Sequence, residues 1–138
     1  MLKQKSLIHF IKLPKIFDDC NLVFAQTPNH IPFIIKRVFY IFQADTKLPR
    51  GYHAHRQTRQ VIFCIQGTIK LTLDDGKKQQ TTILKEPNIG VFIDKMVWHN
   101  MQDFKENTIL LVLASKVFNE ADYIRDYEQF KKKANQIR

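Results

Sequence analysis

The feature of this sequence that most constrains its fold is a series of short apolar runs, rich in β-branched and aromatic residues and separated by turn residues. The runs recur from residue 33 to residue 114 at intervals of about eight to twelve residues, with Gly67 and the Asp74-Asp75-Gly76 triplet at tight turns. Short strands with frequent turns are typical of a β-sandwich, a β-barrel or a jelly roll. The sequence therefore predicts a mainly β protein.

The expected strands cover residues 5–12, 22–25, 33–43, 52–56, 60–66, 68–73, 79–84, 90–93, 97–103 and 108–114. After the last of them the pattern changes, because Tyr123, Ile124, Tyr127 and Phe130 recur at helical spacing, with acids before them and lysines after them. We expect one C-terminal α-helix that opens at Asn119. The length of the chain fits a single domain over residues 1–138.

The charge of the chain points to an anionic partner. Its 22 lysines and arginines against 13 acids give a net charge of +9, which favours a phosphorylated small molecule or another anion. Nucleic acid is not expected, because no nucleic-acid-binding motif is present and the aromatic residues lie in apolar runs rather than between basic residues.

The sequence carries no signal for secretion or for the membrane. Residues 1–15 lack the long apolar core and the cleavage site of a signal peptide, and no apolar stretch approaches the length of a membrane span. Cys20 and Cys64 form no metal or redox motif, which fits a reducing compartment. We therefore expect a cytoplasmic protein with no membrane partner.

Two histidines carry the chemistry that the sequence suggests. His53 and His55 are two residues apart in a predicted strand, so their side chains project from the same face. Four residues separate His55 from Gln60, and six more lead to Gly67. This spacing resembles the first motif of the cupin superfamily at every position but one, because Gln60 stands where that motif has a metal-binding glutamate.

The second cupin motif is more degraded. Gly90 matches its first position, but Met96 and Trp98 stand where the motif has proline and glycine. His99 lies two residues before the position of the motif's histidine. A divalent ion in such a site normally needs a carboxylate beside the imidazoles, so we expect neither metal nor cofactor. Without a metal, imidazoles that titrate near neutrality are suited to general acid–base work.

Six segments, taken in order and including those of this motif, make the resemblance more specific. They are residues 31–41, 50–55, 60–67, 97–101, 112–115 and 122–127. Together they resemble the dTDP-4-dehydro-6-deoxyglucose 3,4-ketoisomerases, the WxcM-like sugar isomerases, from about residue 16 to the C-terminal helix. The resemblance implies a metal-free, cupin-type homodimer with strand exchange. It also implies a dTDP-linked 4-keto-6-deoxyhexose as substrate, with a 3-keto product for 3-amino-3,6-dideoxyhexose synthesis and surface polysaccharide.

The resemblance also implies roles for individual residues. His53, the first histidine of the motif, is expected to be the carbon base, and His55 is expected to orient it or to move the hydroxyl proton. Arg37 is the candidate partner of the enediolate oxygen, because alternation places it on one face of its strand with Phe39. The expected substrate-binding residues are Arg50, which suits a diphosphate, and Gln60, Trp98, His99 and Tyr40.

One departure from the family pattern leaves rival functions open. Phe39 stands where family members carry an active-site tyrosine, so a phenol that could shuttle protons between sugar oxygens is missing. The alternatives are a metal-dependent cupin enzyme acting on another small molecule and a non-catalytic cupin that binds a sugar nucleotide. The positions of Asp19 and His99 are linked to C4 stereochemistry in the family, but these residues do not decide between gluco and galacto products.

Overall fold

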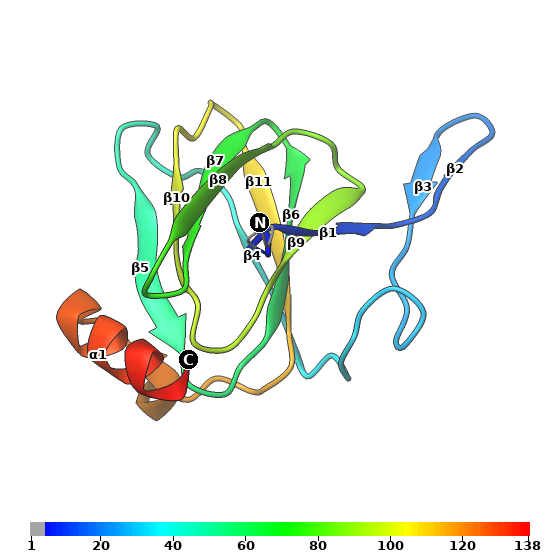
Figure 1. Ribbon diagram of the computed structural model, residues 1–138. Helices are drawn as coiled ribbons and strands as arrows, with labels where there is room; N and C mark the ends of the chain where they lie inside the picture. The colour runs from blue at the N-terminus through cyan, green and yellow to red at the C-terminus, as the bar shows by residue number, and fades with distance from the viewer. Residues whose placement is uncertain (1–4) are drawn as a thin grey trace.

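The computed structural model, which describes residues 5–138, consists mainly of two five-stranded sheets that face each other (Figure 1). The first sheet has the spatial order β1 (His9–Lys12), β9 (Ile89–Ile93), β6 (Gln60–Gln66), β11 (Ile109–Ala114) and β4 (Arg37–Ile41). The second has the order β12 (Tyr123–Ile124), β5 (Arg50–His55), β10 (Trp98–Gln102), β7 (Ile69–Asp74) and β8 (Gln79–Leu84). Neighbouring strands run antiparallel, and the helix α1 (Tyr127–Ile137) follows the last strand. The predicted mainly β class with one C-terminal helix is confirmed.

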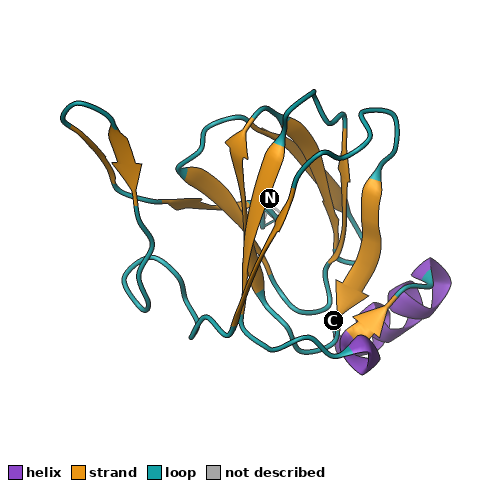
Figure 2. Ribbon diagram, turned by 180° about the vertical axis from the view of Figure 1, so that it is seen from behind, coloured by secondary structure: helices purple, strands orange, loops and turns teal. Residues whose placement is uncertain are grey.

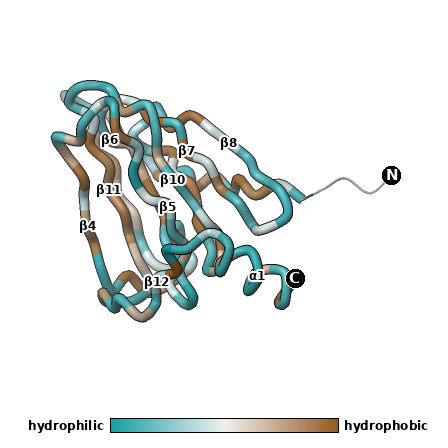
Figure 3. The backbone as a smooth tube through the Cα atoms, turned by 90° about the vertical axis from the view of Figure 1, so that its left-hand side faces the viewer, coloured by the Kyte–Doolittle hydropathy of each residue, from teal (hydrophilic) through white to brown (hydrophobic). Residues whose placement is uncertain are grey.

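The core lies between the two sheets. Ile62 and Leu110 from the first sheet are buried against Leu71 and Leu73 from the second, because alternate residues of each strand point inward. Strand β6 is buried on its other face as well, where Phe63 packs among residues of the segment that precedes β4. Figure 3 shows the hydrophobic residues concentrated along β4, β6 and β11, and hydrophilic residues along α1.

The N-terminal part extends away from the body of the molecule. Strand β1 pairs with β9 of the same chain, and β2 (Lys15–Phe17) and β3 (Asn21–Val23) form a hairpin that projects outward (Figure 2). The predicted first strand over residues 5–12 is shorter in the structure, and residues 1–4 of the expected domain lie outside the described residues. The described residues include no helix that is long and apolar enough to cross a membrane.

Two further predicted elements differ from the structure. The strand expected over residues 33–43 is reduced to β4, because the preceding residues leave the sheet and bury Ile31 and Phe33 against its outer face. The helix expected from Asn119 begins only at Tyr127. Before it come a 3₁₀ turn at Glu120–Asp122 and the strand β12, whose backbone pairs with β5 and buries Ile124.

Candidate active site

The backbone of β5 is shaped so that its histidines meet those of β10. Gly51 has φ of 96° and Tyr52 has φ of 60°, and the register between β5 and β10 shifts between His99 and Asn100. A Cβ atom on Gly51 would lie 2.9 Å from the carbonyl oxygen of His99, so only glycine allows this close approach of the two strands. The irregularity leaves His53 paired directly with His99.

Three histidines therefore form one cluster. The ring centroids of His53 and His99 are 4.6 Å apart, those of His53 and His55 are 5.0 Å apart, and those of His55 and His99 are 6.0 Å apart. One ring nitrogen from each histidine lies within 4.8 Å of the other two. His55 and His99 are buried, whereas His53 is partly accessible and lines a cavity between the two sheets.

The cavity has a volume of about 220 Å³. It is lined by Phe39 and Ile41 of β4, by Arg50, Gly51 and His53 of β5, by His99 and Met101 of β10, by Gln60, Ile62, Ile93 and Val112 of the first sheet, and by Tyr123 and Arg125. An apolar floor with a few polar groups at its wall is the usual composition of a small-molecule site.

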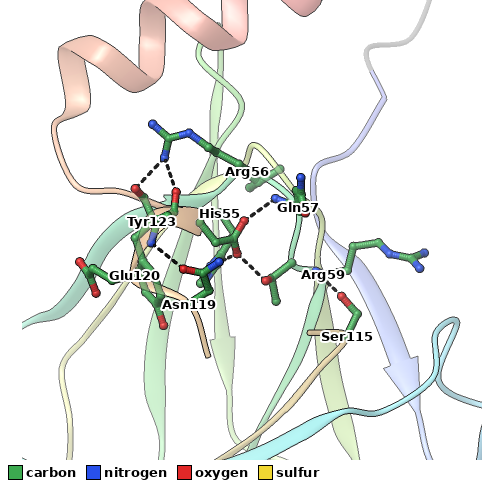
Figure 4. Close-up of polar contacts among 12 residues, drawn as sticks. His55, Arg56, Gln57, Arg59, Ser115, Asn119, Glu120 and Tyr123 are labelled. Atoms are coloured by element: carbon green, nitrogen blue, oxygen red, sulfur yellow. Dashed lines mark hydrogen bonds and ion pairs between the residues drawn. The ribbon is translucent and has the colours of Figure 1, made fainter. Parts of the chain in front are cut away.

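His55 is held by the carboxylate of Asp122, and Figure 4 shows the polar contacts around this histidine. Its Nδ1 lies 3.1 Å from Oδ2 of Asp122, while the backbone N–H of Gln57 donates to Oδ1 of Asp122 at 2.7 Å and the Thr58 hydroxyl donates to Oδ2. On the neighbouring strand, Nδ1 of His99 lies 3.2 Å from the carbonyl oxygen of Val97. These bonds fix the orientation of two of the three rings.

Burial keeps the cluster neutral at physiological pH. Desolvation, and then the neighbouring His55, lower the pKa of His53 to about 4. Desolvation and then His53 lower the pKa of His99 to about 3. Desolvation also lowers the pKa of His55, although Asp122 opposes it. Neutral imidazoles carry a free lone pair at pH 7, so the cluster can accept a proton.

The structure brings most of the predicted site residues together. His53, His99, Arg50 and Gln60 line the cavity, and His55 packs directly behind His53. The guanidinium of Arg37, at the start of β4, lies 5.5 Å from the ring centroid of Phe39 and 5.8 Å from that of Phe118. The Nε atom of Arg37 is buried without a hydrogen-bond partner.

Two predicted substrate-binding residues lie elsewhere. Trp98 is buried in a cluster behind the second sheet, where its ring packs against Tyr127 and Phe130 of α1. Tyr40 lies on the outer face of β4 and is 64% exposed. Each of them directly adjoins a residue that lines the cavity, and adjacent strand residues point to opposite faces. Trp98 and Tyr40 are therefore not among the residues that line this cavity.

Several residues near the histidines were missed by sequence reasoning. Asp122, Tyr123 and Arg125 belong to a segment that the sequence assigned to the C-terminal helix. The ring of Tyr123 contacts those of His53 and His55, with centroids 5.0 and 4.5 Å apart. Cζ of Arg125 lies 4.4 Å from the centre of the Tyr123 ring. A two-residue strand shows no periodicity, but the acid before it, the phenol within it and the guanidinium after it were together a usable signal.

The three imidazoles could also hold a divalent transition metal ion, since three histidines with one open position form a known ligand set. The fit is incomplete by the usual pattern of this fold. The next polar residue on the cavity wall is Gln60, whose amide is a weaker and uncharged ligand than a carboxylate.

Comparisons with known proteins agree with this geometry. The family model described as FdtA: WxcM-like, C-terminal matches residues 6–135. The chain is 43% identical over 123 residues to the TDP-4-oxo-6-deoxy-α-D-glucose-3,4-oxoisomerase of Aneurinibacillus thermoaerophilus, covering 88% of each protein.

Solved structures are similar over nearly the whole chain. The 3,4-ketoisomerase QdtA of Thermoanaerobacterium thermosaccharolyticum in complex with TDP has a TM-score of 0.91 at 37% identity, covering 94% of this chain and 96% of that one. A histidine-to-asparagine mutant of QdtA in complex with TDP-4-keto-6-deoxyglucose has a TM-score of 0.92 at 36% identity, covering 96% and 97%. The TDP-quinovose 3,4-ketoisomerase WlaRB of Campylobacter jejuni has a TM-score of 0.88 at 37% identity, covering 93% and 99%. The chain therefore belongs to the FdtA, WxcM-like family of sugar 3,4-ketoisomerases that its motifs predicted.

Proposed function

We propose that this protein moves the keto group of dTDP-4-keto-6-deoxy-D-glucose from C4 to C3. The observation that carries the proposal is His53, a neutral imidazole on the wall of a largely apolar cavity, with His55 and His99 against its ring. The relatives that bind TDP and TDP-4-keto-6-deoxyglucose support the substrate class.

The reaction needs a base that reaches two adjacent carbons. His53 takes the proton from C3, which leaves an enediolate across C3 and C4, and then returns a proton to C4. Over the same cycle the hydroxyl proton of O3 is lost and O4 gains one, so the net change is an isomerisation with no oxidant. A partly buried imidazole whose pKa is about 4 is unprotonated at pH 7 and is therefore ready to accept the first proton.

The oxygen side of the reaction needs positive charge and a hydroxyl group. We assign Arg37 to the enediolate oxygen, because its guanidinium stands beside Phe39, a residue of the cavity wall. Position 39 lacks a phenol, but Tyr123 provides one, because it lines the cavity against His53. Either this phenol or water would carry protons between O3 and O4.

The size and charge of the cavity suggest which part of the substrate lies inside it and which part lies against its arginines. A volume of about 220 Å³ lies below the range of about 300–1,000 Å³ for sites that hold a drug-sized ligand. We propose that the cavity holds the sugar ring and that the diphosphate lies against Arg50 and Arg125, which line the same cavity.

We further propose that the enzyme works as a cytoplasmic homodimer. The projecting hairpin exposes Ile16, Phe17 and Leu22, and the outer face of β4 exposes Val38 and Tyr40. Exposed apolar side chains on these two segments favour an interface. The β1–β9 pairing, here within one chain, is one that two subunits could exchange, and sedimentation analysis would test the dimer. The 3-keto product would serve an aminotransferase in 3-amino-3,6-dideoxyhexose and surface-polysaccharide synthesis.

The direct test is hydrogen exchange. Incubation of dTDP-4-keto-6-deoxyglucose with the protein in deuterated water should replace the C3 hydrogen of the recovered substrate with deuterium and should yield the 3-keto sugar with deuterium at C4. His53→Asn should abolish both, whereas the same substitution at His9, an exposed residue of β1, should leave them unchanged. Full activity in H53N would remove His53 from the role of base.

The same experiment separates the two rival functions. Absence of exchange at high protein concentration, together with binding of TDP, would favour a non-catalytic sugar-nucleotide-binding protein. The histidine cluster gives the metal-dependent alternative a specific basis, and a stoichiometric transition metal in protein purified without chelators would favour that alternative.

A further inference from the structure

Asp122 is placed beside the histidine cluster by the turn that precedes β12. The backbone N–H of Arg56 donates to the carbonyl oxygen of Asp122 at 2.8 Å, and β12 then pairs Tyr123 with His55. These backbone bonds bring the carboxylate against the turn that follows β5. Its side chain is only 12% exposed, and both of its oxygens are occupied by donors from this turn and from His55.

These contacts determine which nitrogen of His55 carries the proton. An ionised carboxylate can only accept hydrogen bonds, so Nδ1 of His55 must donate to Asp122 and Nε2 must hold the lone pair. Hydrogen bonds from Thr58 and Gln57 outweigh burial and keep the pKa of Asp122 below its ordinary value, so the carboxylate is ionised at pH 7.

Two ring atoms inside the cluster lack partners. Nε2 of His55 and Nδ1 of His53 are both buried without a hydrogen bond, and the two rings meet edge to face with centroids 5.0 Å apart. A buried nitrogen without a partner destabilises the folded state. An acceptor at Nε2 of His55 and a donor at Nδ1 of His53 are chemically complementary groups in adjoining rings.

We propose that Asp122 is a positioning residue of the isomerase, which acts through His55 to hold His53 in the tautomer that has its proton on Nδ1 and its free lone pair on Nε2. This inference rests on the proposed function. Because Nδ1 of His53 is buried, Nε2 is the atom left to face the cavity and take the C3 proton. The imidazolium that forms is stabilised by the chain of donors that ends on the carboxylate, and His53 regains its starting state when it protonates C4.

The substitution Asp122→Asn tests this chain. The Gln57 N–H at 2.7 Å requires an acceptor, so the new amide nitrogen should turn toward His55. Nδ1 of His55 would then accept, its proton would move to Nε2, and the acceptor for His53 would be lost. We expect C3–hydrogen exchange to fall by about 10²–10⁴-fold, with the affinity for TDP unchanged.

The matched control is Asp126→Asn, four residues away, where asparagine can replace aspartate as the N-cap of α1. This variant should keep wild-type exchange. Nitrogen-15 NMR of the histidine rings adds a readout that a merely structural role would not move: His55 should carry its proton on Nδ1 in the wild type and on Nε2 in D122N.

The outcomes distinguish this inference from the proposed function. If the wild-type protein does not exchange the C3 hydrogen, the proposed function is wrong whatever D122N does. If the wild type exchanges and D122N retains both full exchange and the Nδ1 tautomer, the role of Asp122 is wrong. Should D122N not fold, the ring spectrum of the wild type decides, because a proton on Nε2 of His53 would contradict the proposal.

Discussion

The buried histidines should make the stability of this protein unusually sensitive to mild acid. Unfolding returns His53 and His99 to an ordinary pKa of 6.5, whereas in the folded state burial lowers these values to about 4 and about 3. Between the folded and unfolded pKa values the unfolded chain binds more protons than the folded protein does. Stability is therefore complete above pH 6.5 and is lost as the pH falls toward the pKa values of the folded state. From pH 7 to pH 5 each histidine should cost about 2 kcal/mol, or about 4 kcal/mol together.

This loss of stability barely depends on the pKa values of the two histidines in the folded state, provided that both stay below 5. A loss of about 4 kcal/mol is a large part of the 5–15 kcal/mol that stabilises a typical domain. His55 contributes in the same direction, because its pKa is also lowered. Arg37 and Arg125 face this histidine from β4 and from the end of β12, and their positive charges oppose its protonation.

Urea unfolding at the two pH values measures the effect, with the fluorescence of Trp98, the single tryptophan, as the probe. The variant His99→Asn, which cannot titrate at this position, should lose about 2 kcal/mol less between pH 7 and pH 5 than the wild type. The comparison is between the two changes in the free energy of unfolding from pH 7 to pH 5, so a general destabilisation of the variant does not affect it. An unchanged pH dependence in H99N, or a wild type equally stable at both pH values, would refute the reasoning.

Two other predictions concern residues whose positions only the structure defines. Phe39→Tyr places a phenol on the cavity wall beside Arg37, so kcat for isomerisation should rise; an unchanged or lower kcat would show that no phenol is needed there. Trp98→Phe should reduce the free energy of unfolding by about 1–3 kcal/mol, because it weakens the packing against Tyr127 and Phe130, and should leave KM unchanged. A raised KM in W98F would show that Trp98 contributes to substrate binding.

Part of the site could be predicted because it depends on local spacing. The interval of two between His53 and His55 is sufficient to place both side chains on one strand face. The alternation that sets Arg37 and Phe39 apart from Tyr40 follows from the same rule, and the structure confirms it. Alternation also places Trp98, the neighbour of His99, on the face away from the cavity, and the structure buries it on that face.

The rest depends on contacts between distant segments. Asp122 reaches His55 across 67 residues of sequence, and the two-residue strand β12 exists because the edge of β5 offers it backbone partners. Neither has a periodicity that marks it in the sequence. The apparent helical spacing of Tyr123 and Ile124 was misleading, because these residues satisfy their hydrogen bonds in a sheet rather than in a helix.

The sequence by itself determined the alternating strands, the paired histidines, the basic charge and the family, since all of these are properties of residue type and short-range spacing. Only the tertiary structure decided which groups surround the histidines and in what state they are held. Burial between the sheets makes the imidazoles neutral, and Asp122 orients one of them. Desolvation and orientation arise from the packing of segments far apart in the chain, and no local pattern encodes them.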